Sequence, residues 1–296
     1  MDAFDPTKLG PRCDAYLARA LGRPARLVDS QRLAASTRFA PWRLDVEMDG
    51  AARSFVLRLE SRRIEHEFAV LRAMEAVPIP TPRVYGWDAT GEALGSRAFL
   101  ADFIEGESLL PALVAGEPWA EALYVDTVCD LQAVTRDQLS SIADRLGPGE
   151  TAEDCLELAH AAFGARADPL AETVYAQLKD TMPALPRVRF SNGDLWPDNL
   201  LVLDGKLAAV IDFTNAGFSD PLYEFLLPFF LRTELRGRGT EEEYCRRMGF
   251  DPQSLSWYRG LEYFDTWHWV MKTGKPFEQH TAASLNRALQ EWLATG

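Results

Sequence analysis

The sequence is short of positive charge. Its 296 residues contain 31 Lys and Arg against 44 Asp and Glu, which leaves a formal net charge of -13. Nucleic acids and anionic membranes are bound through clustered Lys and Arg, so this composition argues against both as partners. A polyanionic small molecule could still be bound, provided that a metal ion or a local basic spot accompanies it.

The sequence also lacks cysteine pairs and long apolar runs. Its four cysteines stand far apart without a CxxC pair, which is typical of reduced thiols in a cytosol rather than of a disulfide framework or a zinc site: Cys13, Cys129, Cys155 and Cys245. The longest apolar candidate, LLPFFL, lies between Glu224 and Arg232, and the first ten residues are acidic and turn-like. Neither a membrane span nor a signal peptide is indicated, and we expect a soluble cytoplasmic protein.

Hydrophobic patterning divides the chain at about residue 104. Strict alternation over residues 42–48, a hairpin signal at Asp49-Gly50 and a second alternating run after it predict paired strands. A helix carrying Phe68, Leu71 and Met74 follows, and then a strand from Ala98 to Ile104. Residues 1–104 are therefore expected to form a small lobe with an antiparallel sheet. At the start of the chain, Asp5 and Pro6 are expected to begin one helix that runs to Gly22.

Residues 105–296 are predicted to be mostly helical, with amphipathic stretches near 119–136, 152–165 and 169–182. Only short strands around an Asp204-Gly205 turn interrupt them. A chain of this length has room for two lobes that share a cleft. The fold class expected is therefore α+β, with a hinge near residues 102–106.

Two segments concentrate carboxylates at fixed spacing: FSNGDLWPDNLLV at 190–202 and AVIDFTNAGFSDP at 209–221. Asp194 and Asn199 stand five residues apart in the first, and Asp212 ends a strand in the second. One carboxylate and one amide oxygen suit Mg²⁺, which keeps most of its waters and bridges to phosphates. Asp194 would then be free to accept a proton, and Arg58, on an upstream strand, could hold phosphate groups. This set of residues favours phosphoryl transfer.

The same segments resemble the catalytic and metal-binding motifs of the aminoglycoside phosphotransferase and choline kinase-like family, whose members have a two-lobe protein-kinase-like fold. FVLRLE resembles the nucleotide strand of that family, HEFAVLRAM its partner helix, and RAFLADFIEGESL its hinge. The resemblance covers roughly residues 27 to 225. It implies magnesium-dependent transfer of the γ-phosphate of ATP or GTP to a hydroxyl group. The implied roles are a catalytic base at Asp194, metal ligands at Asn199 and Asp212, a phosphate contact at Arg58 anchored by Glu67, and hinge contacts to the nucleotide at Asp102 and Ile104.

The sequence departs from the family pattern at two places. Asn192 stands where His usually precedes the Gly-Asp pair, and we expect its amide to support the loop backbone equally well. The phosphate-covering loop, LAASTRFAPW, has no glycine, so backbone amides approach phosphates less freely and Ser36 could make the contact instead. Glu65 competes with Glu67 as the partner of Arg58. A catalytically silent nucleotide-binding module that regulates a partner is the alternative function.

A stripe on the helix predicted near residue 260 indicates the acceptor. Tyr258, Glu262, Asp265 and Trp269 fall on one side of this helix and combine aromatic faces with carboxylates. Such a surface suits a hydroxylated cationic acceptor, an amino alcohol or amino sugar. The alternative is a polar helix face that simply contacts water. Asp220, which precedes Pro221, is expected to cap a helix rather than to bind a ligand.

Overall fold

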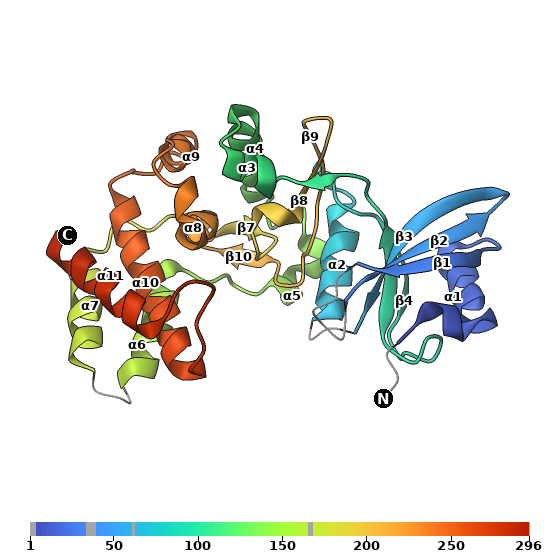
Figure 1. Cartoon of the computed structure of the whole chain (residues 1–296), viewed down its shortest axis with the longest axis horizontal. Coiled ribbons are helices and arrows are strands. Elements are labelled where there is room, and N and C mark those ends of the chain that lie inside the picture. Colours follow the sequence, from blue (N-terminus) through green and yellow to red (C-terminus); the bar gives the residue numbers. More distant parts are fainter. Residues whose placement is uncertain (1–3, 34–39, 61–62, 165–167, 296) are drawn as a thin grey trace. The chain divides into compact units, whose positions relative to one another are not determined.

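The computed structural model describes residues 4–33, 40–60, 63–164 and 168–295. These residues form two compact units (Figure 1). The first contains residues 1–107 together with 136–145 and 200–216, and the second contains 108–135, 146–199 and 217–296. The fold class is the expected α+β: a small antiparallel sheet in the first unit and a mostly helical second unit. No helix in the described part of the chain is long and apolar enough to cross a membrane.

The first unit is built on a five-stranded antiparallel sheet with strand order β1-β2-β3-β5-β4. Its strands are β1 (Arg26–Arg32), β2 (Trp42–Met48), β3 (Ala51–Leu59), β4 (Val84–Asp88) and β5 (Ala98–Asp102). Asp49 and Gly50 join β2 to β3 with φ of 51° and 76°. Positive φ at both positions is the conformation of a two-residue turn that matches the twist of the strands, as the Asp-Gly pair predicts.

The two faces of this sheet have different coverings. On one face Leu44, Phe55, Leu57 and Leu100 pack with α1 (Pro11–Leu21) in a hydrophobic core. Because side chains alternate along a strand, Val56, Arg58 and their neighbours point to the other face, where α2 (Ile64–Met74) lies. The prediction of one helix from Pro6 to Gly22 was wrong in one respect. A short 3₁₀ turn, η1 (Pro6–Leu9), capped by Asp5, precedes α1, and Gly10 separates the two with φ of 49°.

The segment 200–216 adds a hairpin to the first unit. Its strands, β8 (Leu200–Leu203) and β9 (Lys206–Val210), pair antiparallel across Asp204 and Gly205, both with positive φ. The Val210 N–H donates to the carbonyl of Pro80 at 2.9 Å, which fixes the end of β9 against the first unit. This contact helps to position Ile211 and Asp212, which directly follow β9.

The second unit contains the long helices and one short strand pair. The strands β7 (Arg189–Ser191) and β10 (Gly217–Ser219) pair antiparallel. The main helices are α3 (Leu110–Ala115), α4 (Pro118–Gln132), α6 (Ala152–Gly164), α7 (Pro169–Asp180), α8 (Pro221–Leu231), α9 (Thr240–Met248), α10 (Ser254–Thr273) and α11 (Ala282–Thr295). Asp220 caps α8, as predicted, by accepting from the backbone N–H groups of Leu222 and Tyr223 at 3.0 Å each.

Candidate active site

A buried ion pair joins β3 to α2. The Arg58 Nη2 atom lies 2.8 Å from Glu67 Oε2, and Arg58 Nε donates to the same oxygen at 3.2 Å. The side chains are 22% and 3% exposed, respectively. Glu65 pairs instead with Arg145 at 2.7 Å, so the partner of Arg58 is Glu67 and not Glu65. The pairing predicted from the sequence is confirmed.

The surrounding charges keep the Arg58 guanidinium of this pair protonated. Burial lowers the pKa of the Arg58 guanidinium, but the charges of Glu67 and Asp212 outweigh it and the net shift is upward. Burial raises the pKa of Glu67, and the charge of Arg58 opposes that shift. A guanidinium is a suitable partner for a carboxylate held this deep, because it stays protonated.

Asp212 lies beside the pair. Its Oδ1 is 4.0 Å from Arg58 Nη2 and accepts from the backbone N–H of Thr214 at 3.3 Å. Its φ is 55°, a left-handed conformation that few non-glycine residues adopt, while its side chain is 41% exposed. Thr214 also accepts from Arg58 Nη2 at 3.3 Å. Sequence reasoning missed Thr214, although it stands two residues after Asp212 in the quoted motif.

These side chains line a cavity of about 290 Å³ within the first unit. Arg58, Glu67 and Asp212 stand at its polar part, and the rest is mostly apolar: Leu33, Pro41, Val56, Leu71, Pro82, Phe99, Ala101, Asp102, Phe103, Ile104, Gly106, Leu201 and Ile211. A cavity with apolar walls and a few convergent polar groups is typical of a small-molecule site.

The expected hinge residues reach this cavity in different ways. In the described part of the chain, nothing hydrogen-bonds to the backbone N–H of Ile104, so that group is available to a ligand. Asp102 pairs with Phe55 across the sheet, and its carboxylate accepts from Tyr85 Oη at 3.0 Å. Cross-strand partners share a face of the sheet, so the Asp102 side chain points with Phe55 away from this cavity. Asp102 can therefore contribute only its backbone to the cavity. Ser36 lies outside the described residues.

The loop after β7 belongs to the second unit and is organised by two amides. Asn192 is buried; its Nδ2 donates to the carbonyl of Asp194 at 2.9 Å, and its Oδ1 accepts from the N–H of Asp194 at 3.4 Å. This is the backbone support expected of an amide at that position. Asn199 Nδ2 donates to Asp194 Oδ2 at 2.9 Å and to the Asp194 carbonyl at 3.0 Å. Asp194 and Asn199 are thus brought together.

Glu224 on α8 is a second acid near this loop that sequence reasoning missed. It accepts from Ser191 Oγ at 3.3 Å. Burial raises the pKa of Glu224 to about 7; hydrogen bonds from Ser219 and Ser191 oppose the shift, and the charge of Asp194 adds to it. The available signal was a lone acid within the apolar run PLYEFLLPFF. Buried acids with shifted pKa values are enriched at functional sites.

The predicted stripe on α10 is only partly accessible. Tyr258 is 1% exposed and donates its Oη to Asp220 at 2.9 Å, so its ring cannot contact an acceptor and that assignment was wrong. Glu262 is 4% exposed, whereas the Asp265 side chain is 40% exposed and accepts from Tyr223 Oη at 2.9 Å. Trp269 is 39% exposed and contacts the Phe277 ring.

Burial favours the neutral forms of the two carboxyl groups on α10. Burial raises the pKa of Glu262 well above its usual range, and the charges of Asp265 and Glu224 raise it further. Burial likewise raises the pKa of Asp265, while hydrogen bonds from Tyr223 and His268 oppose that shift. A nearby cation favours the ionised forms of such groups, and the charge of Arg236 acts on Glu262 in this direction.

The residues expected to hold Mg²⁺ have suitable donors. In the described ranges, no group of three or more His, Cys, Asp or Glu side chains could hold a metal ion. A Mg²⁺ ion that keeps waters and phosphate oxygens needs fewer protein ligands than that. The amide nitrogen of Asn199 donates to Asp194, so the Oδ1 atom of Asn199 is the atom of this side chain that could ligate a metal ion. Asp212 offers an exposed carboxylate. The donor chemistry therefore fits the ion.

Comparison with known proteins agrees with this fold. The sequence profile of the phosphotransferase enzyme family matches residues 14–258. A candidate aminoglycoside phosphotransferase of Ralstonia eutropha JMP134 superposes with a TM-score of 0.72 at 14% identity over 95% of both chains. A thermostable mutant of the aminoglycoside phosphotransferase APH(4)-Ia, in a ternary complex with ADP and hygromycin B, superposes with a TM-score of 0.65 at 16% identity over 96% of this chain and 98% of that one. The GDP and kanamycin complex of APH(2")-IIIa superposes with a TM-score of 0.61 at 17% identity over 91% of this chain and 94% of that one.

The profile match covers most of the chain, so the protein belongs to the phosphotransferase enzyme family. Its fold is the protein-kinase-like fold that the sequence motifs predict. The expected enzyme class, a phosphotransferase with an alcohol group as acceptor, is confirmed.

Proposed function

We propose that the protein is a Mg²⁺-dependent cytoplasmic kinase that transfers the γ-phosphate of ATP or GTP to a hydroxyl group of a small cationic acceptor. The observation that carries the proposal is the buried Arg58–Glu67 pair with Asp212 beside it in an otherwise apolar cavity. A cation fixed by a buried acid holds nucleotide phosphates in place, and the apolar walls accept a base.

The nucleotide is bound by the first unit. Arg58 contacts the phosphates, Glu67 anchors Arg58, and the backbone at Asp102 and Ile104 pairs with the edge of the base. Solved structures of related enzymes hold ADP or GDP, which makes both ATP and GTP donors to test. Asn199 and Asp212 would hold Mg²⁺, which neutralises phosphate charge when bound.

Asp194 acts as the base. Its carboxylate takes the proton of the acceptor hydroxyl, whose oxygen forms a bond to the γ-phosphorus as the bond to the β–γ bridging oxygen breaks and the nucleoside diphosphate leaves. Asn199 supports this role, because its amide donates to Asp194 Oδ2 and holds the carboxylate in one orientation.

The acceptor is an amino alcohol or amino sugar. Asp265 is its accessible anion, and Trp269 adds an exposed aromatic face. Glu262 stands about one turn earlier on α10, where it is almost fully buried and acts on the acceptor through its charge. The complexes of related enzymes with hygromycin B and kanamycin support this class of acceptor.

A turnover assay with ATP and with GTP tests the proposal. The acceptor panel contains amino sugars, macrolides, choline-like alcohols and glycated amines, and Asp194→Asn is the matched inactive control. Transfer to at least one hydroxylated amine by the parent protein, and none by the variant, is the expected result. Mg²⁺-dependent nucleotide binding without any transfer would instead point to a catalytically silent regulatory module.

A further inference from the structure

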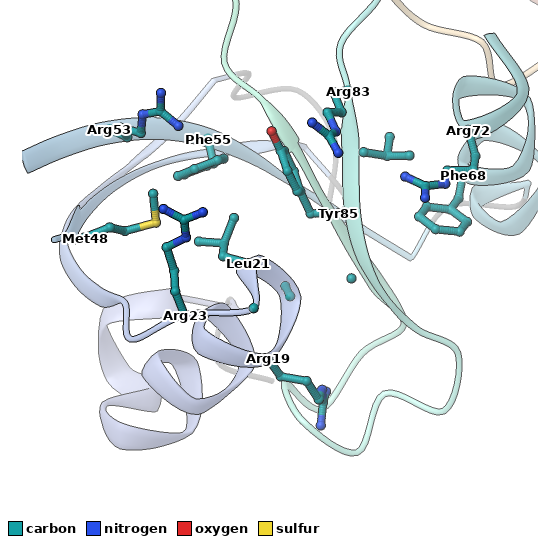
Figure 2. A pocket seen from close by; sticks show the side chains of 14 residues that line it. Arg19, Leu21, Arg23, Met48, Arg53, Phe55, Phe68, Arg72, Arg83 and Tyr85 are labelled. Atoms are coloured by element: carbon teal, nitrogen blue, oxygen red, sulfur yellow. The ribbon is translucent and has the colours of Figure 1, made fainter. Parts of the chain in front are cut away.

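A second cavity in the first unit is lined by arginines. Its volume is about 600 Å³, and it lies beside β4, one of the two edge strands of the sheet. Five arginines line it, and we call it the arginine pocket: Arg19, Arg23, Arg53, Arg72 and Arg83. Figure 2 shows Arg23, Arg53 and Arg83 around the rings of Phe55 and Tyr85, with Arg19 and Arg72 farther along the rim. This is a local concentration of positive charge on a chain whose net charge is -13.

The arginine pocket is separate from the cavity of the proposed nucleotide site. Arg53 and Phe55 alternate along β3 with Val56 and Arg58, so the two pairs point to opposite faces of the sheet. The two cavities have no lining residue in common. An anion held by the arginine pocket would therefore not occupy the place of the nucleotide.

Nearby acids neutralise only part of this charge. Arg23 pairs with Asp49 at 3.0 Å and Arg72 with Glu75 at 3.1 Å. Asp102 is engaged by the Tyr85 hydroxyl.

The other three arginines have no such partner. Throughout the described ranges, no carboxylate lies within 4.0 Å of Arg19, Arg53 or Arg83. Like charges gathered around one cavity repel one another, and a bound anion removes that cost.

The walls between the guanidinium groups are aromatic and apolar. Phe55 and Tyr85 meet edge to face with ring centroids 5.7 Å apart. The Arg83 guanidinium lies 5.6 Å from the centroid of the Tyr85 ring, so that ring helps to position it. Further apolar side chains line the pocket, among them Leu21, Met48 and Phe68. A ligand that fits both features carries several negative oxygens and a compact carbon group.

We propose that the arginine pocket binds a small multivalent oxyanion of the phosphate-ester or diphosphate class. Planar guanidinium groups bind the oxygens of phosphate in pairs, which favours this class over halides and other single-atom anions. Three arginines without a carboxylate partner match a ligand with two or three negative charges. The site does not depend on the phosphotransferase reaction, so either proposal can fail alone.

Calorimetric titration with inorganic pyrophosphate, without added divalent metal, tests this proposal. Arg53→Ala combined with Arg83→Ala should weaken binding at least about tenfold, which corresponds to about 1.4 kcal/mol. Both side chains are exposed, so their removal leaves the core intact. Arg246→Ala combined with Arg287→Ala removes the same charge from exposed positions of the second unit and should leave binding unchanged. Citrate serves as a second probe: pyrophosphate binding with this dependence supports the proposal, whereas binding of citrate without pyrophosphate would overturn the assignment to the phosphate class.

A third variant separates the two cavities. Arg58→Met combined with Glu67→Leu removes the cation of the proposed nucleotide site without leaving a buried carboxylate unpaired, and it should leave pyrophosphate binding at the arginine pocket in place. The proposal is overturned if the Arg53 and Arg83 variant binds pyrophosphate as tightly as the parent, if the folded Arg58 and Glu67 variant no longer binds it, or if the parent does not bind pyrophosphate at about 10 mM.

Discussion

Replacing Arg58 with methionine leaves Glu67 without its cation in a site where the carboxylate is 3% exposed. Methionine fills a volume similar to that of the arginine stem but forms no hydrogen bond, so two charge-assisted bonds at 2.8 and 3.2 Å are lost. Removing one partner of a buried pair costs about 3–5 kcal/mol, because an uncompensated charge stays behind. We expect a loss of this size in the free energy of unfolding at neutral pH, measured from urea denaturation curves.

The same loss should depend on pH. Burial already raises the pKa of Glu67, and loss of Arg58 removes the charge that opposes this shift. The folded state then binds a proton that the unfolded state releases above its ordinary glutamate pKa of about 4.3, so the stability of Arg58→Met should fall as pH rises above that value. The loss should be smaller near pH 5 than near neutrality, by up to about 1.4 kcal/mol per pH unit.

A double variant provides the control. Arg58→Met combined with Glu67→Leu removes the stranded carboxylate and should recover most of the lost stability, because apolar groups of similar volume often replace a buried pair at little cost. Both variants should be inactive in phosphate transfer. A single variant as stable as the parent, or a double variant no more stable than the single one, would refute the physical account of this pair.

Four further predictions concern the acidic residues of the candidate site. Asp194→Asn should leave nucleotide affinity nearly unchanged and abolish transfer, because it removes the base and no phosphate contact; binding titrations and turnover check this. Asp212→Ala should steeply raise the Mg²⁺ concentration needed for turnover, and a parent-like Mg²⁺ titration would show that Asp212 is structural. Asp265→Asn with Glu262→Gln should raise the KM of the acceptor at least about tenfold, roughly 1.4 kcal/mol, without changing the KM of the nucleotide. For Glu224, whose pKa burial raises to about 7, the folded protein binds a proton that the unfolded chain releases above a pKa of about 4.3, so the parent should lose stability as pH rises from about 4.3 to 7; urea denaturation of Glu224→Gln should show a smaller loss over that range.

Local patterns predicted the first unit well because its elements follow short-range rules. Alternation along β2 and β3 and the Asp-Gly turn set the register Met48↔Ala51 through Trp42↔Leu57. The same alternation placed Arg58 opposite to Phe55 and Leu57. The break between η1 and α1 was missed, because apolar residues at helical spacing continue across Gly10 and only its positive φ separates the two elements.

Helical periodicity could not show how far each residue of α10 is buried. Tyr258 and Glu262 belong to one stripe of the helix in sequence, yet Tyr258 hydrogen-bonds to Asp220 at the start of α8, which is a tertiary contact. The acid Glu224 was missed for a related reason. Its raised pKa comes from burial and from charges that lie far away in sequence.

The most direct test of the central claim is phosphorus NMR of the protein with Mg²⁺, ATP or GTP and a hydroxylated amine from the acceptor panel. The account predicts a new phosphate-ester resonance that grows together with that of the nucleoside diphosphate, and its absence when Asp194→Asn replaces the parent protein. The account would be contradicted if no ester formed with any donor and acceptor, or if Asp194→Asn formed it at the rate of the parent.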